Sequence, residues 1–582
     1  MNYLSVYNDI QNNSNIVKIL FNLGGRSYKL SRVPTDSVAK TLKRIGLSVN
    51  KATSTKQKEK KTRNERPDDA KEIPVTLYRQ NGEIVEDEVS NFEAWSEGNV
   101  LEIAGCKFLV EKNTPIVHSA SLPSVTMASF PVVPTLKLEF SDRMNSHYKW
   151  FKQRVSLANE LSDITAEQST SEGEEEWAEV GQEFVYVPGI EDTGCQLKMS
   201  CKAASTEKEA HTWYDVVTSS GVSAGPGQTP FEERQIYTTR PISDASAFRI
   251  VSYNILASCY LEDEATCEAW FGYCPKYALA IEYRQQLLLK EIVGYNADIV
   301  CLQECGSRLF ENYLGPVMKS NGFTGVAMYK SGVMSEGEAI FFKDSKFSLI
   351  SQHNVVVSDC FQNEPCNQDF LENVKRAPKV LERLSSRTTV AQLVVLQHAD
   401  RLQDYICLVN THLYFRPNAP FIRNLQVITI LNHLSEIVKK LDMDLKQTSA
   451  DQSTIGVVFC ADFNSLPYSG AVQLRSTGTL EGDHTEWVLP EDQVQSACNF
   501  KVPSYSHSFE FRNCCGFPEF TTYTDGFKGA IDYIFASRET FEVQAVIPMP
   551  SEDELRVYTA IPSPVMPSDH LALICELKWK KN

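Results

Sequence analysis

The 582-residue sequence has no apolar run long enough to span a bilayer, so we expect no transmembrane helix. It also lacks CxxC pairs, and its 16 cysteines are scattered, which is typical of reduced thiols inside a cell. The first residues, MNYLSVYNDIQNN, lack a charged segment followed by an apolar one, so we expect no secretory signal. The same stretch is acid-poor, but it does not have the Arg-rich amphipathic pattern of a transit peptide.

An excess of positive charge is also missing, because 57 Lys and Arg stand against 74 Asp and Glu, a net charge of −17. Proteins that wrap nucleic acid nonspecifically are usually basic, so this balance argues against that class. It does not exclude a nucleic-acid enzyme, which can gather acids around metal ions and keep a local basic path. The chain is 42% hydrophobic and 23% charged, as expected for a globular protein of two to four domains.

Residues 1–115 show the pattern of a small α+β module. A capped amphipathic helix is predicted over Asp36–Val49. Hairpins are predicted within Asn15–Arg32 around Gly24-Gly25, in Ile73–Arg79 and Glu83–Val89 around Asn81-Gly82, and in Val100–Val110. The polar, charge-rich stretch 51–71 predicts a disordered loop. Its basic first half could touch RNA, although a solvated linker is the preferred interpretation.

Residues 116–220 resemble an immunoglobulin-like sandwich. One predicted strand carries a central Trp150, and a later strand ends in Cys201. The partner cysteine of that fold is missing, since Leu136 and Leu138 occupy the corresponding strand, so we expect no disulfide. An acidic, Ser/Thr-rich insertion is expected over 154–176, and a linker over 221–246.

Residues 247–582 repeat one design, in which an apolar strand stops at a polar residue. The clearest case is VVFCADFNSLP, whose Asp462 and Asn464 are two residues apart and therefore leave one face of a strand. Taken alone, the two side chains could simply bond the backbone in a strand-end turn. Further polar residues end or follow other predicted strands: Asn254, Glu304, His412, Asp532, Asp569 and His570. A purely structural interpretation does not easily explain all of them together.

These motifs resemble the exonuclease–endonuclease–phosphatase superfamily, whose fold is a DNase I-like two-sheet β-sandwich flanked by helices. SYNILA, YNADIVCLQE, THLYFRP, FNSLP, FKGAIDYIFAS and PSDHLALICELKW are similar to its deadenylase branch and occur in the right order through 248–580. The resemblance implies a four-layer α/β catalytic domain at 247–582. The fold class is therefore α+β, with the small module and the Ig-like sandwich preceding this domain.

The chemistry of phosphodiester cleavage requires charge neutralisation, an activated water and a stabilised leaving oxygen. The resemblance implies that Asp462 takes the proton of the attacking water or binds a second metal. It also implies that Asn464 holds the scissile phosphate, and that His412 donates to a phosphate oxygen. His570, oriented by Asp532, would stabilise the pentacovalent state. The implied metal ligands for Mg²⁺, with Mn²⁺ as a substitute, are Glu304, Asn254, Asp462, Asn464 and Asp569.

Substrate residues are implied more weakly. Pro417 and Phe527 match the purine pocket of the deadenylase branch and could sandwich an adenine, although both could also merely pack loops. Arg416 and Arg423 could pair with phosphates, and Glu336 could contact a ribose hydroxyl. Ala461 stands where the family has Gly.

We therefore expect a Mg²⁺-dependent phosphodiesterase that releases 5′-AMP from the 3′ end of adenylate-rich RNA and from 2′,5′-linked oligoadenylates. The alternatives are another phosphoesterase of the same fold, acting on nucleotides, inositol phosphates, lipids or DNA, and a non-catalytic RNA-binding relative. The protein is expected to be a monomer that does not bind membranes. The resemblance implies the mitochondrial matrix, with the cytosol as the alternative.

Overall fold

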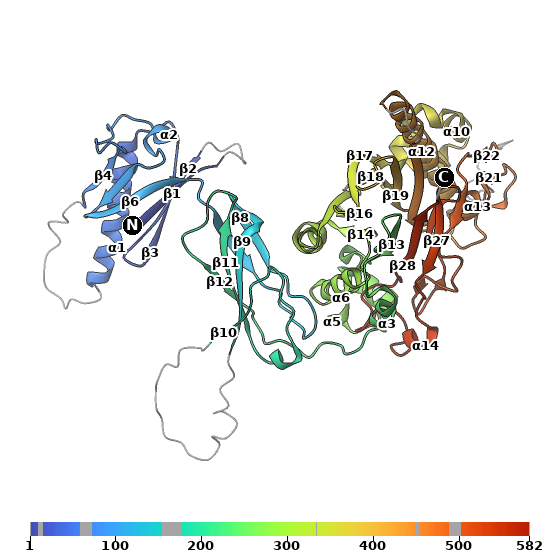
Figure 1. Ribbon diagram of the computed structural model, residues 1–582, viewed down its shortest axis with the longest axis horizontal. Coiled ribbons are helices and arrows are strands. Elements are labelled where there is room, and N and C mark those ends of the chain that lie inside the picture. The colour runs from blue at the N-terminus through green and yellow to red at the C-terminus, as the bar shows by residue number, and fades with distance from the viewer. Residues whose placement is uncertain are drawn as a thin grey trace, which may run out of the picture.

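The computed structural model describes residues 2–9, 16–58, 73–153, 177–332, 335–448, 453–487 and 502–580. In Figure 1 an N-terminal module, a small β-sandwich and a large catalytic domain follow one another across the molecule. Every helix within these ranges is too short or too polar to cross a membrane.

The N-terminal module is a six-stranded sheet covered by one long helix. Its strand order is β3-β2-β1-β6-β5-β4, with β1 and β6 parallel at the centre. The strands are β1 (Asn2–Asp9), β2 (Ile16–Leu23), β3 (Arg26–Arg32), β4 (Val75–Tyr78), β5 (Val100–Ile103) and β6 (Cys106–Lys112). Helix α1 (Val38–Lys58) packs Val38, Ile45 and Val49 into the core of this sheet, and α2 (Asn91–Ala94) is a single turn.

Two predictions for this module are wrong. Helix α1 continues to Lys58, so the first part of the stretch 51–71 is helical rather than disordered, and residues 59–72 lie outside the described residues. The stretch 83–89 forms only an isolated bridge, between Tyr78 and Ile84, and β4 pairs with β5 instead. Ile84 is 61% exposed, but Val85 beside it is buried in the same core in which Leu77 meets Leu101, so the stretch packs onto the module without pairing further as a strand.

The sandwich consists of a two-stranded and a four-stranded sheet. The strands are β7 (Ile116–Ser121) with β8 (Thr135–Glu139), and, in the order β10-β9-β11-β12, β9 (Asp142–Gln153), β10 (Trp177–Gly181), β11 (Leu197–Ala204) and β12 (Tyr214–Val217). Trp150 and Cys201 lie on the neighbouring strands β9 and β11 and share a core with Leu136 of β8. Cys201 is a free thiol, like every cysteine in the described ranges. The predicted insertion 154–176 lies outside those ranges.

The segment predicted as a linker, 221–246, is partly folded onto the catalytic domain. It contains α3 (Pro230–Gln235), whose Phe231 is fully buried. Arg234, also buried, donates hydrogen bonds to the backbone oxygens of Pro548 and Ala572, at 2.9 and 2.7 Å. The linker therefore ends in an anchor rather than in a free tether.

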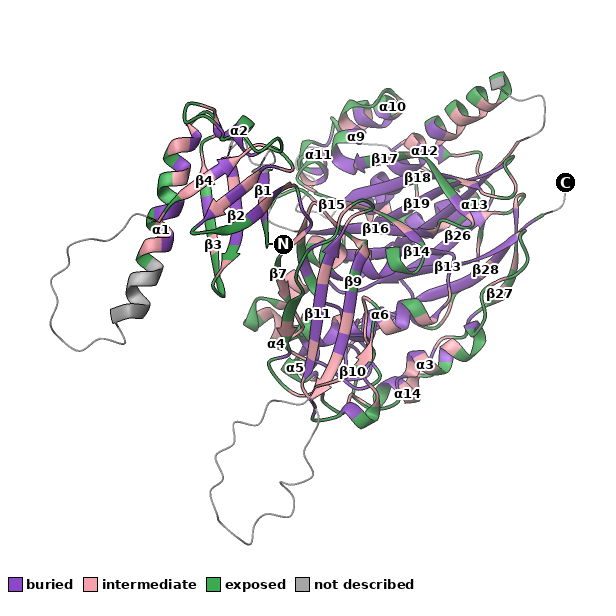
Figure 2. Cartoon of the chain, turned by 60° about the vertical axis from the view of Figure 1, so that its left-hand side comes forward, coloured by how far each residue is buried: buried purple, intermediate pink, exposed green. Residues whose placement is uncertain are grey.

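The catalytic domain has two six-stranded sheets packed face to face, with helices on both outer sides (Figure 2). The first sheet, in the order β15-β16-β14-β13-β28-β27, contains β13 (Ala247–Asn254), β14 (Ile299–Gly306), β15 (Phe323–Tyr329), β16 (Glu336–Lys343), β27 (Phe541–Val546) and β28 (Leu573–Trp579). The second, in the order β17-β18-β19-β20-β26-β23, contains β17 (Phe347–Val356), β18 (Val390–His398), β19 (Asp404–His412), β20 (Thr454–Asp462), β23 (Phe511–Asn513) and β26 (Asp532–Ser537). The short pairs are β21 (Thr479–Leu480) with β22 (Tyr505–Ser506), and β24 (Thr522–Tyr523) with β25 (Lys528–Gly529).

The central strands are buried on both faces because helices cover each sheet from outside. Helices α4 (Glu264–Phe271), α5 (Lys276–Leu279), α6 (Ile281–Gly294), α7 (Ser307–Leu309), α8 (Gly315–Ser320) and α14 (Glu552–Arg556) accompany the first sheet. Helices α9 (Val357–Asn363), α10 (Gln368–Val374), α11 (Pro378–Ser385), α12 (Pro420–Thr448) and α13 (Gly470–Thr477) accompany the second. The predicted DNase I-like sandwich is confirmed. Helices α5 and α6 are separated at Ala280, whose backbone is extended.

Candidate active site

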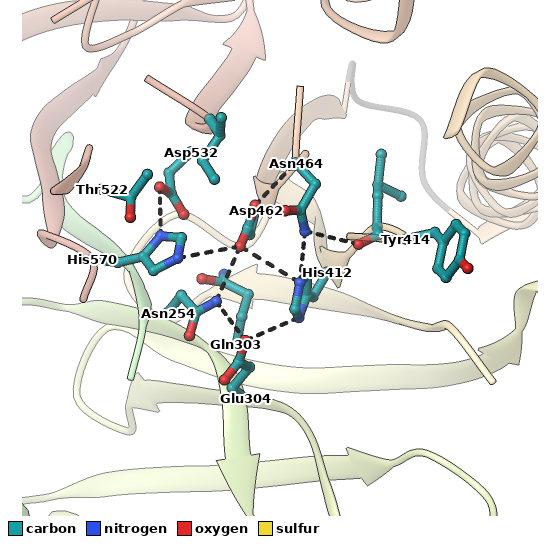
Figure 3. Close-up of polar contacts among 12 residues, drawn as sticks. Asn254, Gln303, Glu304, His412, Tyr414, Asp462, Asn464, Thr522, Asp532 and His570 are labelled. Atoms are coloured by element: carbon teal, nitrogen blue, oxygen red, sulfur yellow. Dashed lines mark hydrogen bonds and ion pairs between the residues drawn. The ribbon is translucent and has the colours of Figure 1, made fainter. Parts of the chain in front are cut away.

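Each of the two sheets contributes a parallel pair of strands whose carboxyl ends meet at one edge of the sandwich. In the first sheet, β13 ends at Asn254 beside β14, which carries Glu304. In the second, β19 and β20 are parallel, and their last residues, His412 and Asp462, lie side by side. Parallel strands point their carboxyl ends the same way, so four polar side chains converge here (Figure 3).

Asn254 joins the two sheets at this edge. Its Nδ2 donates to Glu304 Oε1 and to Asp462 Oδ2, each at 3.0 Å, and all three side chains are buried (Figure 3). Its Oδ1 accepts from the backbone N–H of Leu256, which fixes the orientation of the amide. Two buried carboxylates thus share one amide donor, which is neutral and adds no positive charge between them.

Backbone irregularities aim two of the site residues. The pairing of β14 with β16 shifts register between Leu302 and Cys305, and Glu304 within this bulge has φ +58°. The backbone N–H of Ala257 donates to Oε2 of Glu304 at 2.8 Å. Asn464, just beyond β20, has φ +48°. Left-handed conformations are costly for residues other than glycine, and such strain is concentrated at functional sites.

The carboxyl groups of Glu304 and Asp462 have strongly raised pKa values. Burial raises the pKa of Glu304 to about 7, and the nearby carboxylates of Glu336 and Asp569 add to the increase. Burial also raises the pKa of Asp462 to about 7, with Asp532 as the next cause. Each group can therefore take up or release a proton near neutral pH.

His570 and Asp532 form a buried ion pair. Nδ1 of His570 lies 2.9 Å from Asp532 Oδ2, and that oxygen also accepts from Thr521 Oγ1 at 2.5 Å. Burial alone would lower the pKa of His570, but the charges of Asp532, Asp569 and Asp462 outweigh it and hold the pKa well above its usual value. The other ring nitrogen, Nε2, lies 3.8 Å from Asp462 Oδ2, so a charged imidazolium faces the acid at the end of β20.

His412 has the opposite electrostatic character. Burial, together with the positive charges of Lys330 and His570, lowers its pKa well below the usual value. Its Nε2 lies 2.8 Å from Nδ2 of Asn464, which also donates to the backbone oxygen of Leu413. Its Nδ1 lies 3.7 Å from Glu304 Oε1. The site therefore pairs a neutral histidine with a protonated one.

Two sets of ligands could hold a cation. Asp462, Asp532 and His570 place three ligating atoms within 4.8 Å of one another, but a cation there would have to break the His570–Asp532 contact. The other set is Glu304, Asn254 and Asp462, which offers oxygen atoms, the ligands that Mg²⁺ prefers. Asp569, whose pKa burial also raises, adds a carboxylate next to His570.

The predicted substrate residues divide into exposed and buried ones. Pro417, Arg416 and Phe527 are exposed. Arg423 is buried, and its guanidinium donates to Ser465 Oγ and to the backbone oxygens of Arg416 and Pro417. The expected role of Arg423 in pairing with phosphate is therefore corrected, since its donors already brace the loop that carries Pro417.

Glu336 is also buried, and its Oε1 accepts from Tyr260 at 2.8 Å and from Lys330 at 2.5 Å. The expected contact with a ribose hydroxyl does not fit this internal position. Sequence reasoning missed Tyr260, Lys330 and Thr521, which support the site from outside the strand-end motifs. Only Lys330 had a detectable signal, as a lone basic residue before the acidic strand β16.

Two family descriptions match the chain. The "Endonuclease/Exonuclease/phosphatase family" matches residues 251–570, a range that contains all the strand-end residues described above. The "2′,5′-phosphodiesterase 12-like, N-terminal domain" matches residues 114–220, which correspond to the β-sandwich.

Similar proteins extend the match to almost the whole chain. The human protein named 2′,5′-phosphodiesterase 12 is 35% identical, covering 97% of this chain and 92% of that protein. The CCR4-Not complex 3′-5′-exoribonuclease subunit Ccr4 of Schizosaccharomyces pombe is 28% identical, covering 57% of this chain and 49% of that protein. The crystal structure of ANGEL2, a 2′,3′-cyclic phosphatase, aligns with 58% of this chain and 96% of that chain, at 24% identity and a TM-score of 0.46. The chain therefore belongs to the endonuclease/exonuclease/phosphatase family and, within it, to the group of the 2′,5′-phosphodiesterase 12 proteins.

Proposed function

We propose that this protein is a Mg²⁺-dependent phosphodiesterase that hydrolyses single-stranded adenylate RNA from its 3′ end and releases 5′-AMP. The names of its relatives, a 2′,5′-phosphodiesterase and a 3′-5′-exoribonuclease, support 3′,5′- and 2′,5′-linked oligoadenylates as its substrates. The observation that carries the proposal is the pair of buried carboxylates, Glu304 and Asp462, bridged by Asn254 and faced by a charged His570.

Glu304, Asn254 and Asp462 are the proposed metal ligands, with Asp569 and Asn464 completing the shell. Their donor set fits a hard divalent cation, because two buried carboxylates share one amide and need positive charge nearby. A bound Mg²⁺, or Mn²⁺ in its place, would neutralise phosphate charge and make a water more acidic.

Asp462 is the proposed general base. Its pKa of about 7 lies close to working pH, which suits a group that accepts a proton from water and then releases it. His570 is proposed to stay protonated against Asp532 and to donate from Nε2 to the phosphate, where negative charge increases in the transition state. His412 and Asn464 are proposed to position a phosphate oxygen between them.

Adenine recognition is proposed to lie at the rim of the site. The loops of Pro417 and Phe527 both border the segment that follows Asn464: Arg423 bonds both Pro417 and Ser465, and the ring of Phe527 lies with Leu466 beside Gly529. A proline face and an aromatic ring can hold a base by stacking, which is worth ~1–3 kcal/mol per base. The exposed Arg416 is proposed to meet a phosphate.

The proposal extends to cellular context. On the family resemblance we place the protein in the mitochondrial matrix and expect it to act as a monomer. A reporter fused to the first 40 residues tests the compartment, and light scattering tests the oligomeric state.

The decisive experiment measures AMP release from 3′,5′- and 2′,5′-oligoadenylate, compared with oligo(U) and oligo(C), in Mg²⁺ and in EDTA. Glu304→Gln tests the site, and Glu436→Gln, an exposed glutamate on α12, is the matched control. We expect AMP from both oligoadenylates, little product from oligo(U), and loss of activity in EDTA and in Glu304→Gln only. Activity that survives both treatments would exclude this mechanism, and turnover of inositol phosphate or DNA instead would favour the other phosphoesterases of this fold.

A further inference from the structure

A groove of about 730 Å³ lies where the N-terminal sheet meets the β-sandwich, outside the active site. Its floor is the face of β1, β2 and β3 that points away from α1, and its wall is formed by β7 and the stretch 210–214. Figures 1 and 2 both place these two parts next to each other. The volume lies within the ~300–1,000 Å³ typical of ligand sites.

The floor and the wall of the groove are held together by contacts between the N-terminal module and the sandwich. Lys208 of the sandwich donates to Glu97 Oε1 at 2.9 Å and to the backbone oxygen of Lys112 at 3.0 Å. Nε2 of His211 lies 2.7 Å from Glu111 Oε2, and the ring of His211 stacks on Tyr3 with 3.8 Å between ring centres. The groove is therefore formed before any ligand binds, which reduces the entropic cost of binding.

Aromatic rings are partly exposed in this groove. Tyr3, Trp213 and Tyr214 are 38%, 42% and 37% exposed, although large aromatic side chains usually bury most of their surface. His211 stacks on one face of Tyr3, whose side chain is still 38% exposed. Nζ of Lys149 lies 5.6 Å from the ring centre of Trp213. Paired rings and lysines of this kind form the stacking platforms that bind single-stranded nucleic acid.

The charge of the groove differs from that of the chain. The sequence has 74 acidic residues and a net charge of −17, yet no Asp or Glu is among the described residues that line the groove. Its polar lining consists of serines, threonines, tyrosines, asparagines, two histidines, one tryptophan and the lysines Lys18 and Lys29. Glu111 and Glu139 contact His211 and His118 from outside this lining, and Glu179 pairs with Lys149 at 3.4 Å. A local absence of negative charge suits a polyanion.

We propose that this groove binds a stretch of single-stranded RNA some distance from the 3′ end that enters the active site. Stacking on Tyr3 and Trp213 and phosphate contacts to Lys29 would hold the body of the adenylate tail. The inference rests on the proposed function for the identity of the RNA, although binding in the groove requires no catalysis.

Two assays on the full chain test this inference. The first measures the anisotropy of a 5′-labelled 20-residue oligoadenylate in EDTA, in an Asp462→Asn background that prevents turnover. The second compares kcat/KM on oligoadenylates of 20 and of 3 residues. We expect Tyr3→Ala/Trp213→Ala to weaken binding of the long oligomer about tenfold and to lower its kcat/KM equally, with the trimer unchanged. Trp213→Phe, which keeps an aromatic ring, should retain most of the wild-type affinity and kcat/KM on the long oligomer.

Tyr237→Ala is the matched control, because Tyr237 is 62% exposed and lies outside the groove. Unchanged affinity in the double variant, with normal melting, overturns the inference and makes a protein the better candidate ligand. An equal loss on the trimer also overturns it, because the effect would then lie in the catalytic domain. Ring-dependent binding without AMP release from any oligoadenylate would contradict the proposed function but support the groove.

Discussion

The two sheets of the catalytic domain contribute to one site in different ways. The first sheet supplies Asn254 and Glu304, an amide and a carboxylate that are held by backbone N–H groups and a β-bulge. The second supplies His412, an imidazole whose pKa burial lowers, and Asp462, a carboxyl group whose pKa burial raises to about 7. In the proposed mechanism the first sheet contributes only to cation binding, whereas the second contributes a cation ligand, the general base and the residues that position the phosphate.

The helical layers behind the sheets differ as well, and each contains a fully buried arginine. Arg284 of α6, behind the first sheet, donates to the backbone oxygens of Leu279, Ile255, Leu256 and Pro567. Arg475 of α13, behind the second, has no hydrogen-bond partner among the described residues and packs with its guanidinium 3.3 Å from the ring centre of Phe459. The first arginine ties together the backbone beneath the site, while the second only fills an aromatic core.

The largest expected effect comes from the second sheet. Asp462→Asn removes the proposed base and should lower kcat about 10³-fold with little change in melting temperature. Asp442→Asn, an exposed aspartate on α12, is the control and should be normal. Single-turnover AMP release measures both variants, and a loss below tenfold would assign the base elsewhere.

A smaller effect is expected from the first sheet. Glu304→Gln keeps the shape but removes a charge that would hold the cation, so activity should fall about 10²-fold at low Mg²⁺. Raising the Mg²⁺ concentration should recover most of this loss, whereas it should recover little in Asp462→Asn, which lacks the proposed base as well as a cation ligand. A Mg²⁺ titration of kcat therefore separates the two sheets, and identical titration curves would contradict the division.

A third prediction concerns pH. Asp532 is the main charge that raises the pKa of His570, so in Asp532→Asn burial prevails and the pKa falls. If activity needs protonated His570, its decline with rising pH should then begin at a lower pH than in the wild type. We expect about a tenfold deficit at pH 8 and a smaller one at pH 6. The pH profile of kcat/KM measures the shift. A uniform loss at all pH values would indicate that Asp532 acts only on structure.

The smallest effect on turnover is expected for the pair of buried arginines. Arg284→Met leaves four backbone oxygens without donors and should destabilise the domain by about 3 kcal/mol. Arg475→Met removes a buried charge that has no hydrogen-bond partner in the described chain, and should change stability by less than about 1 kcal/mol or increase it. Thermal melting compares them, and similar destabilisation would contradict the contrast between the layers.

Much of the site was predictable because its residues end apolar strands. Asn254, His412 and Asp462 each close an apolar run typical of a buried strand, and the family resemblance implied that these strand ends meet. Glu304 was found in the same way, but its bulge and its left-handed backbone were not, because they depend on pairing with β16.

The errors arose where a local pattern competed with distant partners. Arg423 lies next to the motif that carries Pro417, and only the folded loop shows that backbone oxygens take up its donors. Strand β1 was missed because NYLSVYND contains Asn and Asp, which strands disfavour, and because its pairing with β2 and β6 is visible only in the folded module. Lys330 and Tyr260 lie outside the strand-end motifs, and their contacts with Glu336 appear only in the folded chain.

The anchor in α3 changes what counts as the smallest autonomous catalytic unit. The match to the endonuclease/exonuclease/phosphatase family begins in β13, yet Arg234 upstream of it donates to Tyr295 of the catalytic core at 3.2 Å and to backbone oxygens just after β27 and just before β28. A chain cut at residue 247 would expose these acceptors and uncover the site of Phe231. Evolution could therefore recombine the catalytic domain with other modules only by carrying this short upstream segment along.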